Sequence, residues 1–156
     1  MRSAYRVLAF VVAGLVVVQA AAIAYAVAGL GKWVQDGNTF DKAAFESDDT
    51  SFDGIVGFMI HGINGMMLIP LVALLLLIVS FFAKVPGGVA RAGMVLGLVI
   101  LQVALGLFGH EVPALGGLHG LNALILFGTA VMAGVRAKEP AVEAASPYGA
   151  ESRTHV

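Results

Sequence analysis

Two of the four histidines in this chain lie in the same five-residue pattern, and both patterns fall inside hydrophobic segments. The first pattern is His61–Gly65 (HGING) and the second is His119–Ala123 (HGLNA). An ionisable side chain inside a membrane segment is energetically costly and usually marks a functional site. Because this costly side chain occurs twice in the same local frame, the sequence predicts one site with two ligands.

The two histidines suit the ligation of a haem. Haem iron binds neutral imidazoles, and helix bundles hold cofactors between facing helices. We therefore predict that His61 and His119 are the axial ligands of one b-type haem. The residues three and four positions after a helical histidine share its face; they are Asn64 and Gly65, and Asn122 and Ala123. The asparagine could orient the ring or bond a neighbouring helix, and the small residue leaves room for a flat group.

Two other interpretations of the histidines stay open. In the first, each histidine and its asparagine only fasten helices together, although such hydrogen bonds contribute only about 0.6 kcal/mol on average. In the second, His110 and Glu111 join His61 and His119 in a divalent metal site suited to zinc or copper. His110 lies at a membrane boundary, so a solvated turn or a contact to a haem propionate is the simpler role for it.

Composition predicts an integral membrane protein. Of the 156 residues, 59% are hydrophobic and only 12% are charged, whereas a soluble domain has about a quarter charged residues. Four apolar runs, at about 7–30, 55–83, 87–109 and 114–135, are each long enough to cross a bilayer of about 30 Å. The first run, of about 24 residues, exceeds the 7–15 of a signal peptide, so we expect a retained span. The predicted fold is an all-α four-helix membrane bundle.

Cysteine content and charge exclude several classes of function. The chain has no cysteine, which excludes disulfides, thiolate metal sites and thiol catalysis. Its net charge is −1 and it has no basic patch, so we expect no nucleic-acid partner. The bilayer itself is the first expected partner.

Basic residues predict the orientation of the spans. Six of them fall on one side if the chain crosses four times: Arg2, Arg6, Lys84, Arg91, Arg136 and Lys138. By the positive-inside rule this side is cytoplasmic, so both termini are expected in the cytoplasm of a bacterial cell with a multi-pass chain in the cell membrane. Residues 1–136 form the expected membrane domain, with an outer loop at 31–54, and 137–156 form an expected disordered cytoplasmic tail.

The two halves of the chain resemble each other. LVVVQ at 15–19 matches LVILQ at 98–102, and the two histidine patterns then align between the second and fourth runs. We predict two similar helical hairpins in tandem, related by a pseudo-two-fold axis along the membrane normal with the site on that axis. Gln19 and Gln102 are matched by this alignment and could bond between helices, or contact a ligand histidine or the cofactor.

Depth places the histidines opposite each other. Each lies about six residues, or roughly 9 Å, inside its span from the outer boundary. Two parallel helices with histidines at equal depth can present them to each other across a bundle. Pro70 is expected to kink the second span below His61.

The outer loop is acidic and aromatic. Residues 31–54 contain six acidic residues against two lysines, a local charge of −4, together with Trp33, Phe40, Phe45 and Phe52. Such a surface could dock a basic redox partner such as a small electron carrier. A plain solvated loop that packs its aromatic residues on the membrane surface is the other interpretation.

A short set of motifs resembles the haem A synthase family. These are LQVALG at 101–106, an outer turn, Leu118-His119 and Asn122-Ala123-Leu124. That family is built from two four-helix halves, each with a histidine on its second and fourth helices. Over roughly 7–135 this chain looks like one half, which implies that His61 and His119 ligate one haem b and that a homodimer would restore eight helices.

The chain also departs from that family. The glutamate that precedes the first family histidine by three residues is replaced by Phe58, and Gly62 stands where an arginine commonly follows. The outer cysteine pair is missing as well. The resemblance therefore implies a haem-binding fold rather than haem A synthesis. We expect electron transfer or haem handling. Two alternatives are a non-haem accessory subunit and an enzyme that oxidises haem or quinone beside Gln19 and Gln102.

Overall fold

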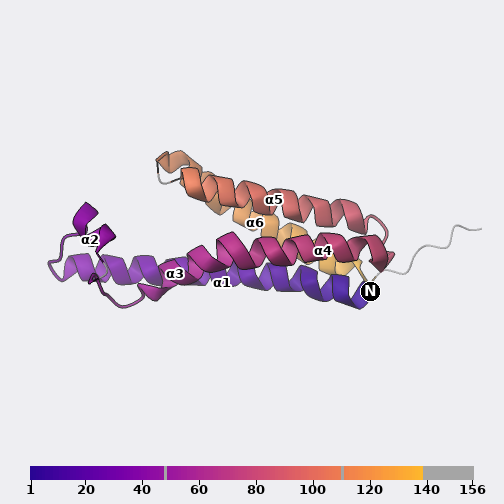
Figure 1. The fold of residues 1–156 in the computed structure, drawn as a ribbon, viewed down its shortest axis with the longest axis horizontal. Coiled ribbons are helices and arrows are strands. Elements are labelled where there is room, and N and C mark those ends of the chain that lie inside the picture. Colours follow the sequence, from indigo (N-terminus) through magenta and orange to yellow (C-terminus); the bar gives the residue numbers. More distant parts are fainter. Residues whose placement is uncertain (48, 110, 139–156) are drawn as a thin grey trace, which may run out of the picture.

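The described residues of the computed structural model, 1–47, 49–109 and 111–138, are helical with short connections. Four helical spans are long and apolar enough to cross a membrane, which confirms the all-α, four-span prediction. Figure 1 shows the elements: α1 (Arg2–Gln35), α2 (Lys42–Glu46), α3 (Val56–Ile63), the π-helical turn η1 (Asn64–Leu68), α4 (Ile69–Ala83), α5 (Gly88–Phe108) and α6 (Pro113–Arg136). From residue 139 on, the predicted tail lies outside the described residues.

Helix α1 is longer than its apolar run. It begins at Arg2 and ends at Gln35, whereas the run covers about 7–30. At 1.5 Å per residue a helix of this length is about 51 Å long, well beyond the roughly 30 Å of a hydrocarbon core. Lys32 near its end pairs with Asp36 at 2.6 Å. A helix can continue into water with polar side chains, so α1 extends beyond its apolar run at both ends.

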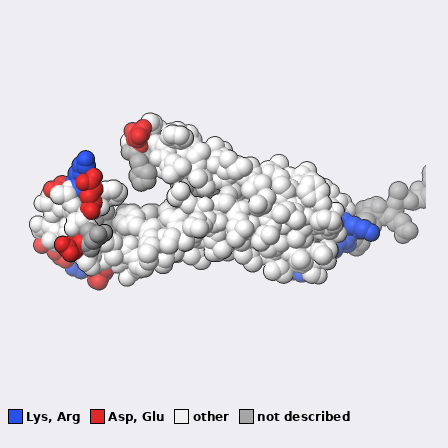
Figure 2. Space-filling view, in the orientation of Figure 1, with Lys and Arg blue, Asp and Glu red and all other residues white. Residues whose placement is uncertain are grey.

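Charge divides the molecule into two ends (Figure 2). The acidic end carries the connection from α1 to α3 and the turn from α5 to α6, and the basic end carries the N-terminus, the α4–α5 turn and the end of α6. Arg2 donates a hydrogen bond to the main-chain oxygen of Lys84 at 2.8 Å, which ties two chain segments together at the basic end. Between the ends the visible surface is uncharged, as expected of a surface in contact with lipid.

The helices form a ring in which the second and fourth spans lie diagonally. Helix α1 packs against α4 and α6, and α5 packs against the same two helices. The core is in the basic half, where its largest fully buried side chains are Tyr5, Leu76, Leu126, Val12, Val95 and Val99. The Tyr5 hydroxyl donates to the main-chain oxygen of Gly88 at 3.1 Å and so joins α1 to the start of α5. This core cluster does not extend into the acidic half, where the two histidines lie.

In the acidic half, α3 lies directly against α1 while α5 and α6 lean away (Figure 1). A Cβ atom on Gly57 would collide with the main-chain oxygen of Ala22, and one on Gly54 would lie 2.7 Å from the main-chain oxygen of Tyr25. Glycine therefore permits the close approach of the two backbones. The space-filling view shows a notch between the α5–α6 tip and the acidic loop (Figure 2).

The second span contains a π-helical turn where a proline kink was expected. The amide of Ile69 donates to the oxygen of Asn64, five residues back, so this turn holds one extra residue. Pro70 follows at the start of α4. Proline cannot donate to the carbonyl four residues back and its ring crowds that carbonyl. The wider turn, which begins at Asn64 within the first histidine pattern, accommodates the proline.

Candidate functional site

His61 and His119 come together in the centre of the bundle. His61 is in α3 and His119 is in α6, so the two come from spans that lie diagonally in the ring. Their ring centres are 6.0 Å apart and the ring planes are inclined at 55°. Both side chains are half-buried. The equal depth expected from the sequence therefore corresponds to a direct approach of the two imidazoles.

Hydrogen bonds assign the tautomer of each imidazole. Nδ1 of His61 lies 3.2 Å from the main-chain oxygen of Gln19, and Nδ1 of His119 lies 3.0 Å from that of Gln102. A carbonyl oxygen can only accept, so each Nδ1 must carry the proton and donate it. In the neutral form of each ring, the Nε2 lone pair is then available to a metal. Metal-binding histidines in proteins commonly show this arrangement, with the second nitrogen bonded to a carbonyl or carboxylate.

The separation of the rings fits one metal atom between two imidazoles. With a metal–nitrogen bond of about 2.0 Å, the metal is about 3.1 Å from each ring centre, so collinear rings have centres about 6.3 Å apart. The observed separation is 6.0 Å. The ring separation is therefore compatible with one metal atom bound by both Nε2 atoms.

The asparagines bond the neighbouring helix rather than the rings. Nδ2 of Asn64 donates to the oxygen of Leu15 at 3.2 Å, and Nδ2 of Asn122 donates to that of Leu98 at 3.0 Å. Both asparagines are buried, with 6% and 5% exposure. Each accepting leucine lies four residues before the glutamine whose carbonyl holds the histidine. One face of α1 and one face of α5 thus receive the same pair of bonds.

The two glutamine side chains behave differently. Gln102 Nε2 donates to the oxygen of His119 at 3.0 Å, and its Oε1 accepts from Asn122 Nδ2 at 2.6 Å. In the other hairpin, Gln19 Oε1 and Asn64 Oδ1 are buried without a hydrogen-bond partner among the described residues. Gln102 therefore both bonds between helices and holds the histidine segment, whereas Gln19 acts on His61 through its main-chain oxygen.

The small residue after each asparagine accounts for this difference. The amide of Gln19 occupies the place where a Cβ atom on Gly65 would stand. Ala123 at the matching position has a Cβ atom and packs beside the core, so the Gln102 amide points elsewhere. Gly65 therefore contacts the Gln19 side chain, whereas the sequence suggested that it leaves room for a flat cofactor.

Gly106 also belongs to the site. A Cβ atom there would lie 3.1 Å from Cε1 and 3.2 Å from Nδ1 of His119, so the ring rests on the glycine backbone of α5. Its position four residues after Gln102, one helical turn along the same face, is the signal that could have identified it. The accepting carbonyls of Leu15 and Leu98 carry no side-chain signal.

The proposed divalent metal set is not assembled by the described residues. Among them, no group of three or more histidines, aspartates or glutamates is placed to hold a metal ion. His110, which that interpretation requires, lies outside the described residues, and Glu111 is exposed. The described part of the site is a pair of imidazoles.

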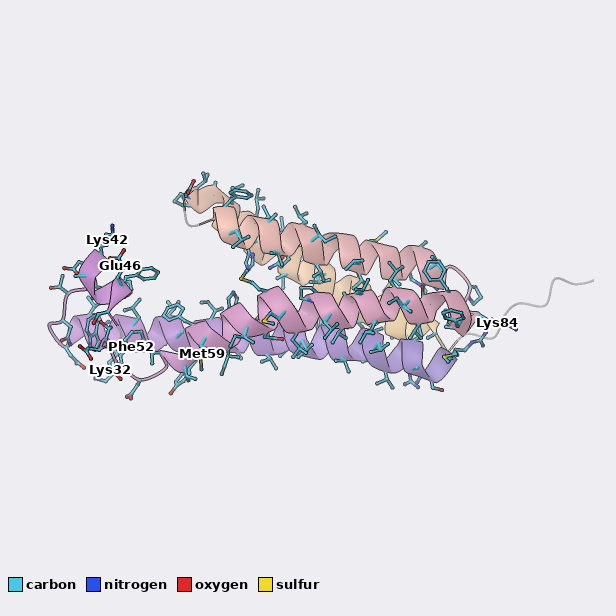
Figure 3. All side chains as sticks on the ribbon, in the orientation of Figure 1. Lys32, Lys42, Glu46, Phe52, Met59 and Lys84 are labelled. Atoms are coloured by element: carbon cyan, nitrogen blue, oxygen red, sulfur yellow. The ribbon has the colours of Figure 1, made fainter. Side chains whose placement is uncertain are left out.

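The acidic loop contains two local ion pairs and an aromatic cluster. Lys32 pairs with Asp36 at 2.6 Å, and Lys42 pairs with Glu46 at 3.6 Å, all with exposed side chains. The Trp33 ring centre lies 6.5 Å from that of Phe40 and 5.9 Å from that of Phe52. Figure 3 shows Phe52 and Lys32 at the acidic end of the molecule, opposite the end that carries Lys84.

Comparison of the chain with protein-family models, with curated proteins and with solved structures gave no match. The geometry of His61 and His119, with their hydrogen bonds, is therefore the basis on which a function can be assigned. Two imidazoles whose Nδ1 atoms bond main-chain carbonyls lie with their ring centres 6.0 Å apart, and in the neutral form such rings can ligate a metal-centred planar cofactor.

Proposed function

We propose that this protein binds one haem b between α3 and α6, with His61 and His119 as the axial ligands, for electron transfer or haem handling. The observation that carries the proposal is the orientation of the two imidazoles. Both have Nδ1 engaged by a carbonyl, and their ring centres are 6.0 Å apart. Helix fastening alone does not require that two rings with the same Nδ1 hydrogen bond also lie this close to each other.

Packing supports a cofactor in the acidic half. The large, fully buried side chains that fill the basic half end at about the level of Val99 and Leu126. Beyond this level, α3 follows α1 while α5 and α6 pair with each other. A haem needs apolar walls, and exposed phenylalanine and leucine residues of these segments could supply them once a porphyrin is present, for example Phe58, Leu107 and Phe108.

Each part of the chain has a defined task in this proposal. Bound haem iron would supply one-electron chemistry. The carbonyls of Gln19 and Gln102 hold the imidazole protons on Nδ1 and thereby raise the basicity of the ligating nitrogens. The amides of Asn64 and Asn122 fix the register of each histidine helix on its neighbour. Gly106 supports the ring of His119.

We further propose that the chain is a tandem pair of hairpins with the basic end in the cytoplasm of a bacterial cell. The matched bonds support the duplication: the second span bonds to Leu15 and Gln19, and the fourth bonds to Leu98 and Gln102. The separation of charge between the two ends agrees with the positive-inside rule. The haem would then lie near the outer face, with both described ends of the chain inside.

Partners follow from the same arrangement. The lipid bilayer surrounds the uncharged middle of the molecule, a homodimer is a hypothesis based on the resemblance, and the acidic loop is the candidate surface for a basic redox partner. Two of its acidic residues are already paired within the loop. Such exposed pairs contribute little energy and leave the loop's net charge unchanged.

One observation favours a second candidate, a non-haem accessory subunit. The histidine and asparagine bonds fasten α3 to α1 and α6 to α5, which is the task that this alternative assigns to them. It does not require the Nε2 atoms to be free or the rings to face each other. This alternative would be favoured if the bundle unfolds when either histidine is replaced by alanine and the wild type binds no haem.

Visible absorption of the detergent-purified protein tests the proposal. The oxidised and dithionite-reduced spectra should show a Soret band and, after reduction, sharp α and β bands of low-spin haem b. His61→Ala and His119→Ala should each lose or shift these bands, while Thr129→Ala, lower on α6, should leave them unchanged. A wild-type protein without a Soret band, even after addition of hemin, would contradict the proposal.

A further inference from the structure

The two sides of the site are not held equally. Around His119, four hydrogen bonds join α6 to α5, and their donor–acceptor distances are 3.0 Å or less. Around His61, two bonds join α3 to α1, and both are 3.2 Å. Histidine, asparagine and glutamine are matched on both sides, and the patterns differ at their last residue, Gly65 in one and Ala123 in the other.

The His61 side also contains buried acceptors that no described group satisfies. These are Oε1 of Gln19 and Oδ1 of Asn64. An unsatisfied buried polar group costs about 1–3 kcal/mol, so the first hairpin is not in its best hydrogen-bonded arrangement. On the other side the equivalent oxygen of Gln102 accepts from Asn122.

Support beneath the rings differs as well. The ring of His119 lies so close to Gly106 of α5 that a Cβ atom on this residue would be 3.1 Å from Cε1 of the ring. Four residues after Gln19, the matching position of α1 is Ile23, so the first hairpin has no glycine there. The ring of His61 therefore lacks, at the matching position, the glycine contact that the ring of His119 has.

The helices that carry the rings differ in continuity. Helix α6 runs unbroken from Pro113 to Arg136 and packs along both α5 and α1. Helix α3 has eight residues, packs along α1 and passes into the π-helical turn at Asn64. Such turns are less regular than α-helix and are frequent at functional sites.

From these differences we propose that His61 is the exchangeable ligand, and that small neutral iron ligands, carbon monoxide or free imidazole, bind in its place. This inference rests on the proposed haem site. In the exchange the bond from iron to His61 Nε2 breaks and a bond from iron to the incoming carbon or nitrogen forms. Iron keeps its oxidation state, and the His61 ring leaves neutral with its Nδ1 proton. His119 remains bound throughout.

Carbon monoxide provides the direct test on the full-length, haem-loaded protein in detergent. The dithionite-reduced wild type should bind the gas, with a shift of the Soret band and loss of the sharp α band. His61→Ala should bind it at least tenfold faster because no ring must leave. A wild type with bis-histidine spectra that stays unchanged under saturating carbon monoxide overturns the inference while leaving the haem site intact. A wild type without haem overturns the proposed function itself.

The haem affinity of the two alanine variants gives a second, independent readout. His61→Ala retains the firmly held ligand and His119→Ala retains the loosely held one, so hemin should dissociate about tenfold more readily from His119→Ala. Free imidazole should restore a low-spin spectrum to His61→Ala at lower concentration than to His119→Ala. Far-ultraviolet circular dichroism confirms that both variants are folded. Equal affinities, or the opposite order, would overturn the inference.

If neither alanine variant folds, Gly106→Ile provides the comparison. This substitution gives the second hairpin the residue type that the first has at Ile23. We expect carbon monoxide to bind this variant faster than wild type, because the ring of His119 loses its support and both ligands become exchangeable. An unchanged rate would count against the role assigned to the glycine surface.

Discussion

Replacing each asparagine of the repeated pattern by leucine should have unequal effects, because the two make different numbers of hydrogen bonds. Asn122 Nδ2 donates to Leu98 at 3.0 Å and to Gln102 at 2.6 Å. Asn64 Nδ2 donates to Leu15 at 3.2 Å, and its Oδ1 is buried without a partner among the described residues. Leucine has nearly the same size, so the comparison isolates the polar groups.

The magnitudes follow from these bonds. Hydrogen bonds between membrane helices average about 0.6 kcal/mol, so the two bonds of Asn122 contribute about 1.2 kcal/mol. Asn122→Leu also leaves Oε1 of Gln102 without its donor, which raises the expected loss to about 2 kcal/mol. Asn64→Leu removes one bond of about 0.6 kcal/mol but also removes an unsatisfied acceptor. We expect its effect to lie within about 0.5 kcal/mol of zero.

Unfolding of the haem-free protein in mixed micelles provides the assay. Dodecyl sulfate is titrated into the detergent-solubilised protein, helix content is followed by circular dichroism, and Trp33, the single tryptophan of the chain, reports on the acidic end. The difference between the two variants should be about 2 kcal/mol, with Asn122→Leu the less stable. Equal losses, or a larger loss in Asn64→Leu, would refute the unequal hydrogen bonding described above.

Two further substitutions and a pair of single-residue deletions test how the site is positioned. Gly57→Ala should cost about 1–3 kcal/mol, measured by the same titration, because the added methyl group would push α3 off α1. Gly65→Ala should be nearly neutral, within about 1 kcal/mol, because only the flexible amide of Gln19 must move and alanine favours helix; a large loss would contradict this account. Deleting Met67 from the π-helical turn should preserve hemin binding because it leaves an ordinary helix, whereas deleting Leu121 from α6 should abolish it by rotating the histidine by about 100°.

The spans and the meeting of the histidines could be predicted because each depends on one simple property. Runs of apolar residues gave the four spans, with errors of a few residues at their ends. Equal depth of His61 and His119 on the second and fourth spans was enough to expect that they face each other. Both predictions rest on bilayer thickness and helix rise, which do not depend on packing detail.

Elements that depend on several weak contacts were not predicted. Helix α2 is five residues long and is capped by Asp41, which accepts from the amide of Ala44 at 2.9 Å. Its aromatic neighbour Phe40 lies against Trp33. The π-helical turn was not predicted for another reason. Pro70 indicates an irregularity in the helix, but a kink and a widened turn both relieve the clash between proline and the preceding turn.

The unequal hydrogen bonding could not be predicted from two nearly identical patterns. Gln19 and Gln102 are the same residue in matched segments, yet their side chains adopt different positions. The cause is a single methyl group, absent at Gly65 and present at Ala123, which decides where the amide can lie. A side-chain choice of this kind depends on the distance between two backbones, which the sequence alone does not contain.

The central claim is that His61 and His119 together hold one haem b. Titration of the purified, haem-free protein with hemin, followed at the Soret band, tests it most directly. The account predicts a break at one hemin per chain and a low-spin spectrum, with the break lost or the spectrum changed to high spin when either histidine is alanine. Absorbance that rises without a break, or a wild type and double variant with the same curve, would contradict it.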